Sequence, residues 1–238
     1  YMKRIKKTKI IATLGPSSSG LIEKLIKEGV DVFRINFSHS NHKEAEILIN
    51  KIRIINTKLK TNTSILADLQ GPKLRIGEIK PNTHLNDGDD IIIKAGNEFI
   101  GDGKAIFVNY KTLPTDINKG EDILVDDGKI ILKVTDTNKT DQINAKVIQG
   151  GDLFSNKGFN LPNTNISQPA LTEKDIKDAI FSAKQNVDWI ALSFVREVAD
   201  VKLLIELLEK NTDHRIPVIA KIEKPEGVKN IDDIMKYA

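Results

Sequence analysis

The amino-acid sequence predicts an α/β protein in which a parallel, helix-connected sheet is interrupted by a small all-β domain. Three observations predict it. Residues 9–69 alternate between strand-like and helix-like patterns. Residues 71–165 carry short β-rich runs and turn signals without a convincing helical pattern, and the alternation resumes after Pro169. We therefore expect one domain from residues 1–70 and 166–238, with residues 71–165 inserted into it.

The segments before the insertion follow a strand–helix–strand–helix–strand order. Gly15-Pro16 stops the first strand, and the serines after it are candidate helix N-caps. The second helix carries an apolar stripe at helical spacing. The expected strands are 9–14, 30–37 and 64–69, and the expected helices are 17–29 and 41–59.

Caps, apolar periods and turn signals also predict the elements of the insertion and of the segment after it. Thr172 and Asp175 fit a capping box that opens a helix after the insertion. The β-rich runs of the insertion are 90–94, 106–109, 123–125, 130–134 and 143–148. After it we expect helices at 172–185, 198–210 and 231–237 and strands at 187–195 and 218–222.

The number of residues outside the insertion limits the size of the sheet. Removing residues 71–165 leaves 143 of the 238 residues. A complete eight-stranded β/α barrel takes about 250 residues, or roughly 31 per unit. The remainder therefore provides between four and five units. An incomplete barrel and an open five-stranded α/β sheet both fit this count.

Composition excludes several classes of function. The chain has no cysteine, which excludes a disulfide framework and a thiolate metal site. Its net charge of +3 is too small to argue for nucleic acid, and no apolar run approaches the length of a membrane span. The basic N-terminal segment has no apolar stretch after it, unlike a secretory signal. We expect a cytoplasmic protein without nucleic-acid or membrane partners.

Polar groups gather at the ends of the expected strands, where barrels place catalytic groups. Lys221 and Glu223 are two residues apart at the end of an apolar strand, so they project from one face. A structural ion pair explains them equally well. Arg34, Asn36 and Ser38 share one face of the second strand, and such groups suit a phosphate beside a hard cation. A polar turn with a helix cap is the alternative.

Other strand ends add charge and oxygen ligands. Asp68 ends the third strand, and Lys73 and Arg75 follow it after a Gly-Pro turn. Lys157 lies on a glycine-supported loop, and Ser193 ends the fourth strand. The alternatives are a solvated edge for Lys73 and Arg75, a flexible loop for Lys157 and a helix entry for Ser193. Four of these cations (Arg34, Arg75, Lys157 and Lys221) and the carboxylates of Asp68 and Glu223 occur without a Ser-His-Asp triad or a Cys-His pair. Such a set suits phosphoryl transfer, in which positioning and charge stabilisation dominate.

Five runs, in this order, resemble the pyruvate kinase family. They are TKIIATLGPSS at 8–18, RINFSH at 34–39, GPKLR at 71–75, KGFNLP at 157–162 and IAKIE at 219–223. The resemblance extends from about Lys6 to the last residue. It implies an incomplete (β/α)8 barrel of about five units, with a β-rich lid domain inserted after the third strand. It also implies a homotetrameric enzyme that transfers phosphate from phosphoenolpyruvate to ADP with Mg²⁺ or Mn²⁺, giving pyruvate and ATP.

The resemblance also implies roles for individual residues. Arg34 would bind the transferring phosphate, Lys221 would stabilise its charge in flight, and Glu223 would bind the divalent metal. The nucleotide and cation site would include Asn36, Ser38, His39, Arg75 and Lys157.

A monovalent-cation site is implied at Asn36, Ser38, Asp68 and the backbone oxygen of Leu69. Here Lys73 stands where potassium-dependent members typically carry glutamate, which resembles the potassium-independent branch. The ammonium would supply the charge of the ion, so we expect no K⁺ requirement.

The chain stops at Ala238, before the family's second metal-binding carboxylate. We therefore expect the isolated chain to be inactive and to self-associate. Two other readings stay open: a non-catalytic phosphate-, nucleotide- or protein-binding module, and a metal-dependent aldolase or lyase on a phosphoenolpyruvate-type barrel. The latter would not be expected to carry the insertion.

Overall fold

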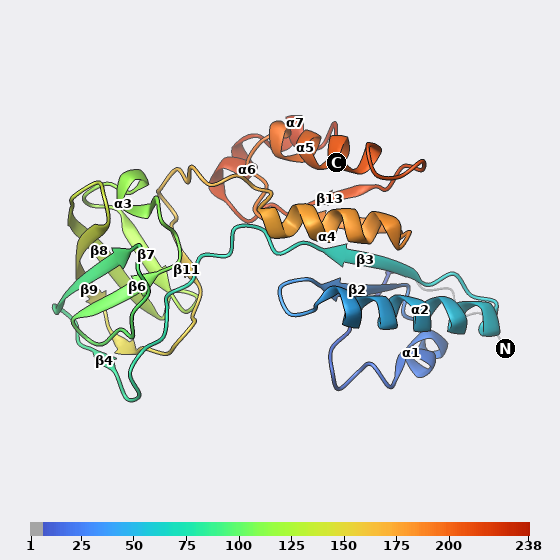
Figure 1. Cartoon of the computed structure of the whole chain (residues 1–238), viewed down its shortest axis with the longest axis horizontal. Coiled ribbons are helices and arrows are strands. Elements are labelled where there is room, and N and C mark those ends of the chain that lie inside the picture. The colour runs from blue at the N-terminus through green and yellow to red at the C-terminus, as the bar shows by residue number, and fades with distance from the viewer. Residues whose placement is uncertain (1–6) are drawn as a thin grey trace. The chain divides into compact units, whose positions relative to one another are not determined.

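A computed structural model describes residues 7–238, so the basic residues at positions 3–6 lie outside it. The described chain forms two compact units (Figure 1). We call residues 7–72 with 169–238 the barrel unit and residues 73–168 the inserted unit. Whether the inserted unit behaves as a separate domain stays a prediction.

The barrel unit contains one parallel sheet in which each strand lies beside its predecessor. Its order is β1-β2-β3-β12-β13, without the reversal of a doubly wound sheet. Successive order is that of a β/α barrel, and five strands are fewer than the eight of a closed one. The predicted fold class, an incomplete barrel, is confirmed. The strands are β1 (Ile11–Thr13), β2 (Val32–Asn36), β3 (Ser64–Asp68), β12 (Trp189–Leu192) and β13 (Val218–Ala220).

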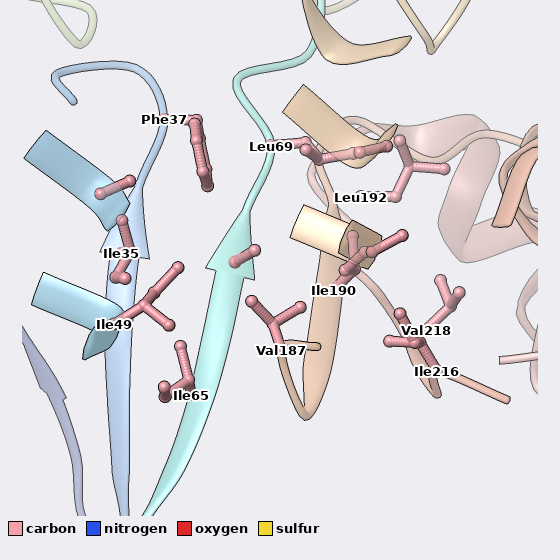
Figure 2. Close-up of a cluster of buried hydrophobic side chains, with 14 of the residues drawn as sticks. Ile35, Phe37, Ile49, Ile65, Leu69, Val187, Ile190, Leu192, Ile216 and Val218 are labelled. Carbon is pink, nitrogen blue, oxygen red and sulfur yellow. The ribbon is translucent and has the colours of Figure 1, made fainter. Parts of the chain in front are cut away.

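The helices of this unit cover one face of the sheet. Alternate strand residues, such as Ile35, Ile65 and Ile190, point into a single apolar core shared with the helices (Figure 2). Burial of this face is the main stabilising contribution of the unit. The helices are α1 (Ile22–Glu28), α2 (His42–Leu59), α4 (Glu173–Lys184), α5 (Val198–Glu209), α6 (Pro225–Lys229) and α7 (Ile231–Ile234).

Capping groups set where α2 and α4 begin. Asn41 and Glu44 form a capping box on α2, and Thr172 and Asp175 form the predicted one on α4. The helix expected at 17–29 begins only at Ile22. Ser18 explains the difference, because its hydroxyl accepts a hydrogen bond from Gly15 N at 2.9 Å and stabilises a turn instead.

The inserted unit has its own apolar core and a six-stranded sheet ordered β11-β7-β8-β9-β5-β6. Its one short helix, α3 (Leu113–Asp116), corrects the expectation of an all-β insertion. The six strands are β11 (Phe159–Asn160), β7 (Asp122–Val125), β8 (Ile130–Thr137), β9 (Gln142–Gln149), β5 (Asp90–Ala95) and β6 (Ala105–Val108). A separate pair joins β4 (His84–Leu85) and β10 (Gly151–Asp152).

Two further expectations near the C-terminus need correction. The strand expected at 187–195 ends at Leu192, because the backbone turns at Phe194, whose φ is 57°. The helix expected at 231–237 is the short α7, preceded by α6. None of the helices in residues 7–238 has the length and hydropathy of a membrane span.

Candidate active site

Asp68 is the centre of a cluster on the sheet face opposite the helices. It ends β3 and is 2% exposed. Its Oδ2 accepts a hydrogen bond from Arg34 Nε at 2.7 Å, and its Oδ1 accepts one from Lys221 Nζ at 3.2 Å. A buried carboxylate is costly without such partners. Asp68 therefore joins the carboxyl ends of β2, β3 and the chain just after β13.

Arg34 connects this centre to the first strand. Its Nη1 donates to Thr13 Oγ1 at 2.9 Å, and its Nη2 forms an ion pair with Asp68 Oδ2. The side chain remains 31% exposed. A guanidinium held on two sides and partly open to solvent is suited to a phosphate, whose oxygens match its fork of donors.

Lys221 is held by groups at the ends of two other strands, β3 and β12, and by Glu223 from its own segment. Its Nζ donates to Ser193 Oγ at 2.9 Å and lies 3.5 Å from Glu223 Oε1, in addition to the bond to Asp68. The ammonium group is therefore directed to this end of the sheet, and the side chain is 29% exposed. The predicted ion pair with Glu223 is present, and it is one member of a larger network.

Glu223 is oriented by a strained residue. Its Oε2 accepts a hydrogen bond from Phe194 N at 3.0 Å, and Phe194 adopts a left-handed backbone that non-glycine residues rarely adopt. The side chain is 35% exposed. Across residues 7–238, no three His, Cys, Asp or Glu side chains gather as a metal-binding group. A single carboxylate can supply one ligand to a hard divalent ion when substrate oxygens and water supply the others.

The turn after β2 carries three of the predicted residues. Asn36 Oδ1 accepts a hydrogen bond from Ser38 N at 3.0 Å, and Asn36 O accepts one from His39 N at 3.0 Å. Asn36 is paired in register with Asp68, and the His39 side chain is exposed. Of the oxygens expected to bind a monovalent cation, Leu69 O accepts a hydrogen bond from Ser193 Oγ at 2.6 Å.

The other predicted residues, Lys73, Arg75 and Lys157, belong to the inserted unit. Arg75 and Lys157 lie on neighbouring backbone segments, because Arg75 forms a bridge with Gly158. Arg75 Nη1 donates to Asn156 O. Lys157 Nζ lies 2.9 Å from Asp126 Oδ1. This unit therefore places Arg75 and Lys157 on paired backbone segments, and each side chain is bound to an oxygen of the same unit.

Asp126 is one of two contact residues that the sequence analysis did not single out. Hydrogen bonds from Lys129, the larger cause, and from Lys157 hold the pKa of its carboxyl below the ordinary range. The other is Thr13, the partner of Arg34. Its place at the end of the first expected strand, two residues after Ile11 on the same face, was the available signal.

Comparison with known proteins agrees with this geometry. The family model described as pyruvate kinase, barrel domain, matches residues 5–238. A pyruvate kinase of Mycobacterium tuberculosis (strain CDC 1551 / Oshkosh) is 39% identical over 233 residues, covering 97% of this chain and 49% of the relative. One of Clostridium perfringens (strain 13 / Type A) is 40% identical over 235 residues, covering 98% and 49%.

A pyruvate kinase of Staphylococcus aureus (strain MRSA252) is 39% identical over 238 residues, covering 98% of this chain and 40% of the relative. The chain thus spans about half the length of the curated relatives it matches, or less. The family model accounts for nearly all of it. The chain belongs to the pyruvate kinase family.

Proposed function

We propose that this chain provides the phosphoryl-transfer site of a pyruvate kinase, which converts phosphoenolpyruvate and ADP into pyruvate and ATP in glycolysis. The observation that carries the proposal is the convergence of Arg34 and Lys221 on Asp68, with both cations partly exposed. Phosphoryl transfer depends on positioned positive charge more than on a nucleophilic side chain. This cluster supplies such charge.

The proposed roles follow from the placement of each group. Arg34 binds the phosphate of phosphoenolpyruvate, and Lys221 stabilises the charge on the phosphoryl group during transfer. Glu223 contributes a ligand to Mg²⁺ or Mn²⁺. When bound, such an ion neutralises phosphate charge and polarises the phosphoryl oxygens.

We assign nucleotide binding to both units. Asn36, Ser38 and His39 contribute from the turn after β2, and Arg75 and Lys157 contribute from the inserted unit. In this proposal, residues 71–165 act as a lid domain that closes over the substrates and excludes water. Assembly into a homotetramer and a cytoplasmic location are part of the same proposal.

Potassium independence is a separate part of the proposal. Asn36, Ser38, Asp68 and Leu69 O would form a monovalent-type site whose charge Lys73 supplies. Replacing Lys73 with glutamate in the active enzyme should then create or strengthen activation by K⁺. An unchanged dependence on K⁺ would rule out this role for Lys73.

A coupled assay for pyruvate tests the main proposal. The unchanged chain, Lys221→Met and a control, Lys27→Met at an exposed side chain of α1, are each assayed with phosphoenolpyruvate, ADP and Mg²⁺, with and without K⁺. We expect any turnover to disappear in Lys221→Met and to persist in the control. Equal turnover in all three would contradict the assignment.

Calorimetric titration of the chain with phosphoenolpyruvate, in the presence of Mg²⁺, separates an enzyme from a binding module. Binding that is lost in Lys221→Met, without turnover in the chain, would indicate a binding module. If the chain shows neither binding nor turnover, that result would fit the expected inactivity of the isolated chain. The same assays would then be repeated on a protein of the relatives' full length.

A further inference from the structure

Ser193 lies between two groups of the proposed active site. It follows β12 directly and is 2% exposed. Its Oγ donates to Leu69 O at 2.6 Å and accepts from Lys221 Nζ at 2.9 Å. The hydroxyl therefore connects the backbone that follows β3 to the ammonium group that follows β13.

The direction of these two bonds restricts what Ser193 can do. A serine hydroxyl has one hydrogen, and here that hydrogen is used by Leu69 O. The oxygen can then act only as an acceptor toward Lys221. A lysine side chain is flexible and its ammonium group has three rotatable donors, so a fixed acceptor selects its position.

The other partners of Lys221 do not fix it in the same way. Asp68 is shared with Arg34, and its two oxygens lie 3.2 and 3.5 Å from Nζ. Glu223 Oε1 is 3.5 Å away on a side chain that is 35% exposed. The Ser193 contact is the shortest of the four, and its acceptor is as deeply buried as Asp68. Gly71 packs so closely that an added Cβ would lie 2.9 Å from Ser193 Cβ, which leaves the serine little room to move.

We propose that Ser193 is a positioning residue that holds the Lys221 ammonium group in place for phosphoryl transfer, by using its only proton on Leu69 O. This inference deepens the proposed function and rests on it. The positioning itself is a property of the chain without substrates, and it can be measured without turnover.

Trace labelling with acetic anhydride measures that positioning. Mass spectrometry would give the acetylation rate of Lys221 relative to exposed Lys24 in the same folded sample. Removing the acceptor in Ser193→Ala should release the ammonium group and raise the relative rate about two- to tenfold, the range expected for one ordinary hydrogen bond.

Two variants separate positioning from packing. Ser182→Ala is the matched control, because Ser182 is equally buried and its hydroxyl has no hydrogen-bond partner within the described chain. It should leave the labelling of Lys221 unchanged. Ser193→Cys keeps nearly the volume of serine but accepts hydrogen bonds weakly, so it should behave like Ser193→Ala.

The outcomes are distinct. Faster labelling in both Ser193 variants, with wild-type circular dichroism and an unchanged Ser182→Ala, supports the inference even if the chain shows no turnover. Wild-type labelling in Ser193→Ala overturns it. Faster labelling in Ser193→Ala with a wild-type rate in Ser193→Cys also overturns it, because lost packing would then explain the faster labelling in the alanine variant. If Ser193→Ala fails to fold, the cysteine variant decides.

Discussion

At the scale of single residues, Asp68 is the group on which the candidate site depends. Its carboxylate is buried, and its two main partners, Arg34 and Lys221, are each about one-third exposed. Removing the negative charge would leave two neighbouring cations facing each other. The loss of a buried partner is costly, but solvent screens the exposed parts of both cations.

We therefore predict that Asp68→Asn lowers the free energy of unfolding by about 1–3 kcal/mol. Urea unfolding followed by circular dichroism would measure it. Glu23→Gln on α1 is the matched control, because Glu23 also accepts from two lysines but at the surface. Lys27 and Lys58 hold its pKa at about 2. The control should unfold close to wild type. Equal effects of the two substitutions would show that Asp68 contributes no more than a surface ion pair.

Residue patterns predicted part of this cluster. The period of two in an expected strand placed Lys221 and Glu223 on one face. Both residues lie just after β13, and their ion pair at 3.5 Å is present. The sequence could not show that Asp68 accepts from both Arg34 and Lys221. Those contacts depend on strand order and register. Arg34 is 34 positions from Asp68 in the sequence, and Lys221 is 153 positions from it. Asp68 was accordingly expected only to offer oxygen to a cation.

At the scale of elements, the segment after β3 depends on Gly71. Its φ is +68°, and an added Cβ would lie 2.9 Å from both Ser193 Cβ and the Phe194 ring. Its N–H donates to the buried Asp175 Oδ1 of α4 at 3.0 Å. The left-handed backbone and the lack of space both require glycine.

Gly71→Ala should therefore lower the free energy of unfolding by about 2–4 kcal/mol, combining backbone strain with overpacking. Gly88→Ala provides the comparison, because Gly88 has φ +86° but open space around it. It should cost about 1 kcal/mol from strain alone. Thermal or urea unfolding of both variants would check this. A Gly88→Ala cost as large as that of Gly71→Ala would leave no role for the contact with Ser193.

Elements with a local signal were predicted better than those without one. The helix expected at 41–59 is α2 within one residue, because Asn41 and Glu44 cap it locally. The helix at 17–29 was predicted too long, since Ser18 could serve a turn as well as a helix. The four-residue α3 is too short to show an apolar period of 3.6 residues, and β-rich runs flank it on both sides. The sequence therefore did not indicate a helix there.

At the scale of the whole molecule, separate cores explain why the insertion was visible in the sequence. The change from helix–strand alternation to short β-runs coincides with the change from one apolar cluster to the other. The strand order β11-β7-β8-β9-β5-β6 was not predictable, because β5 and β6 pair in parallel with no helix between them.

Self-association of the chain also stays a prediction at this scale. The strands β1 and β13 lie at the two ends of the sheet order, and Ile11 and Trp189 are exposed on it. Unpaired strand edges and exposed apolar side chains favour association with another chain.

The last prediction concerns the independence of the inserted unit. Its two ends are held by neighbouring residues of its own. Asn109 Nδ2 donates to Lys73 O at 3.1 Å, and Gln168 N donates to the Tyr110 hydroxyl at 3.4 Å. With its ends fastened internally and its own apolar core, this unit has what a domain needs to fold alone.

Residues 73–168 expressed alone should therefore fold and unfold cooperatively in urea. A shorter piece, residues 80–156, is the control. It lacks the segment around Arg75 and the one around Gly158 that pair with each other, and it lacks Gln168. Circular dichroism should show a sharp transition for the longer piece and a weaker, less cooperative one for the control. An unfolded longer piece would mean that this unit depends on the barrel unit for its stability, and a lid that moves as a rigid body would then lose its physical basis.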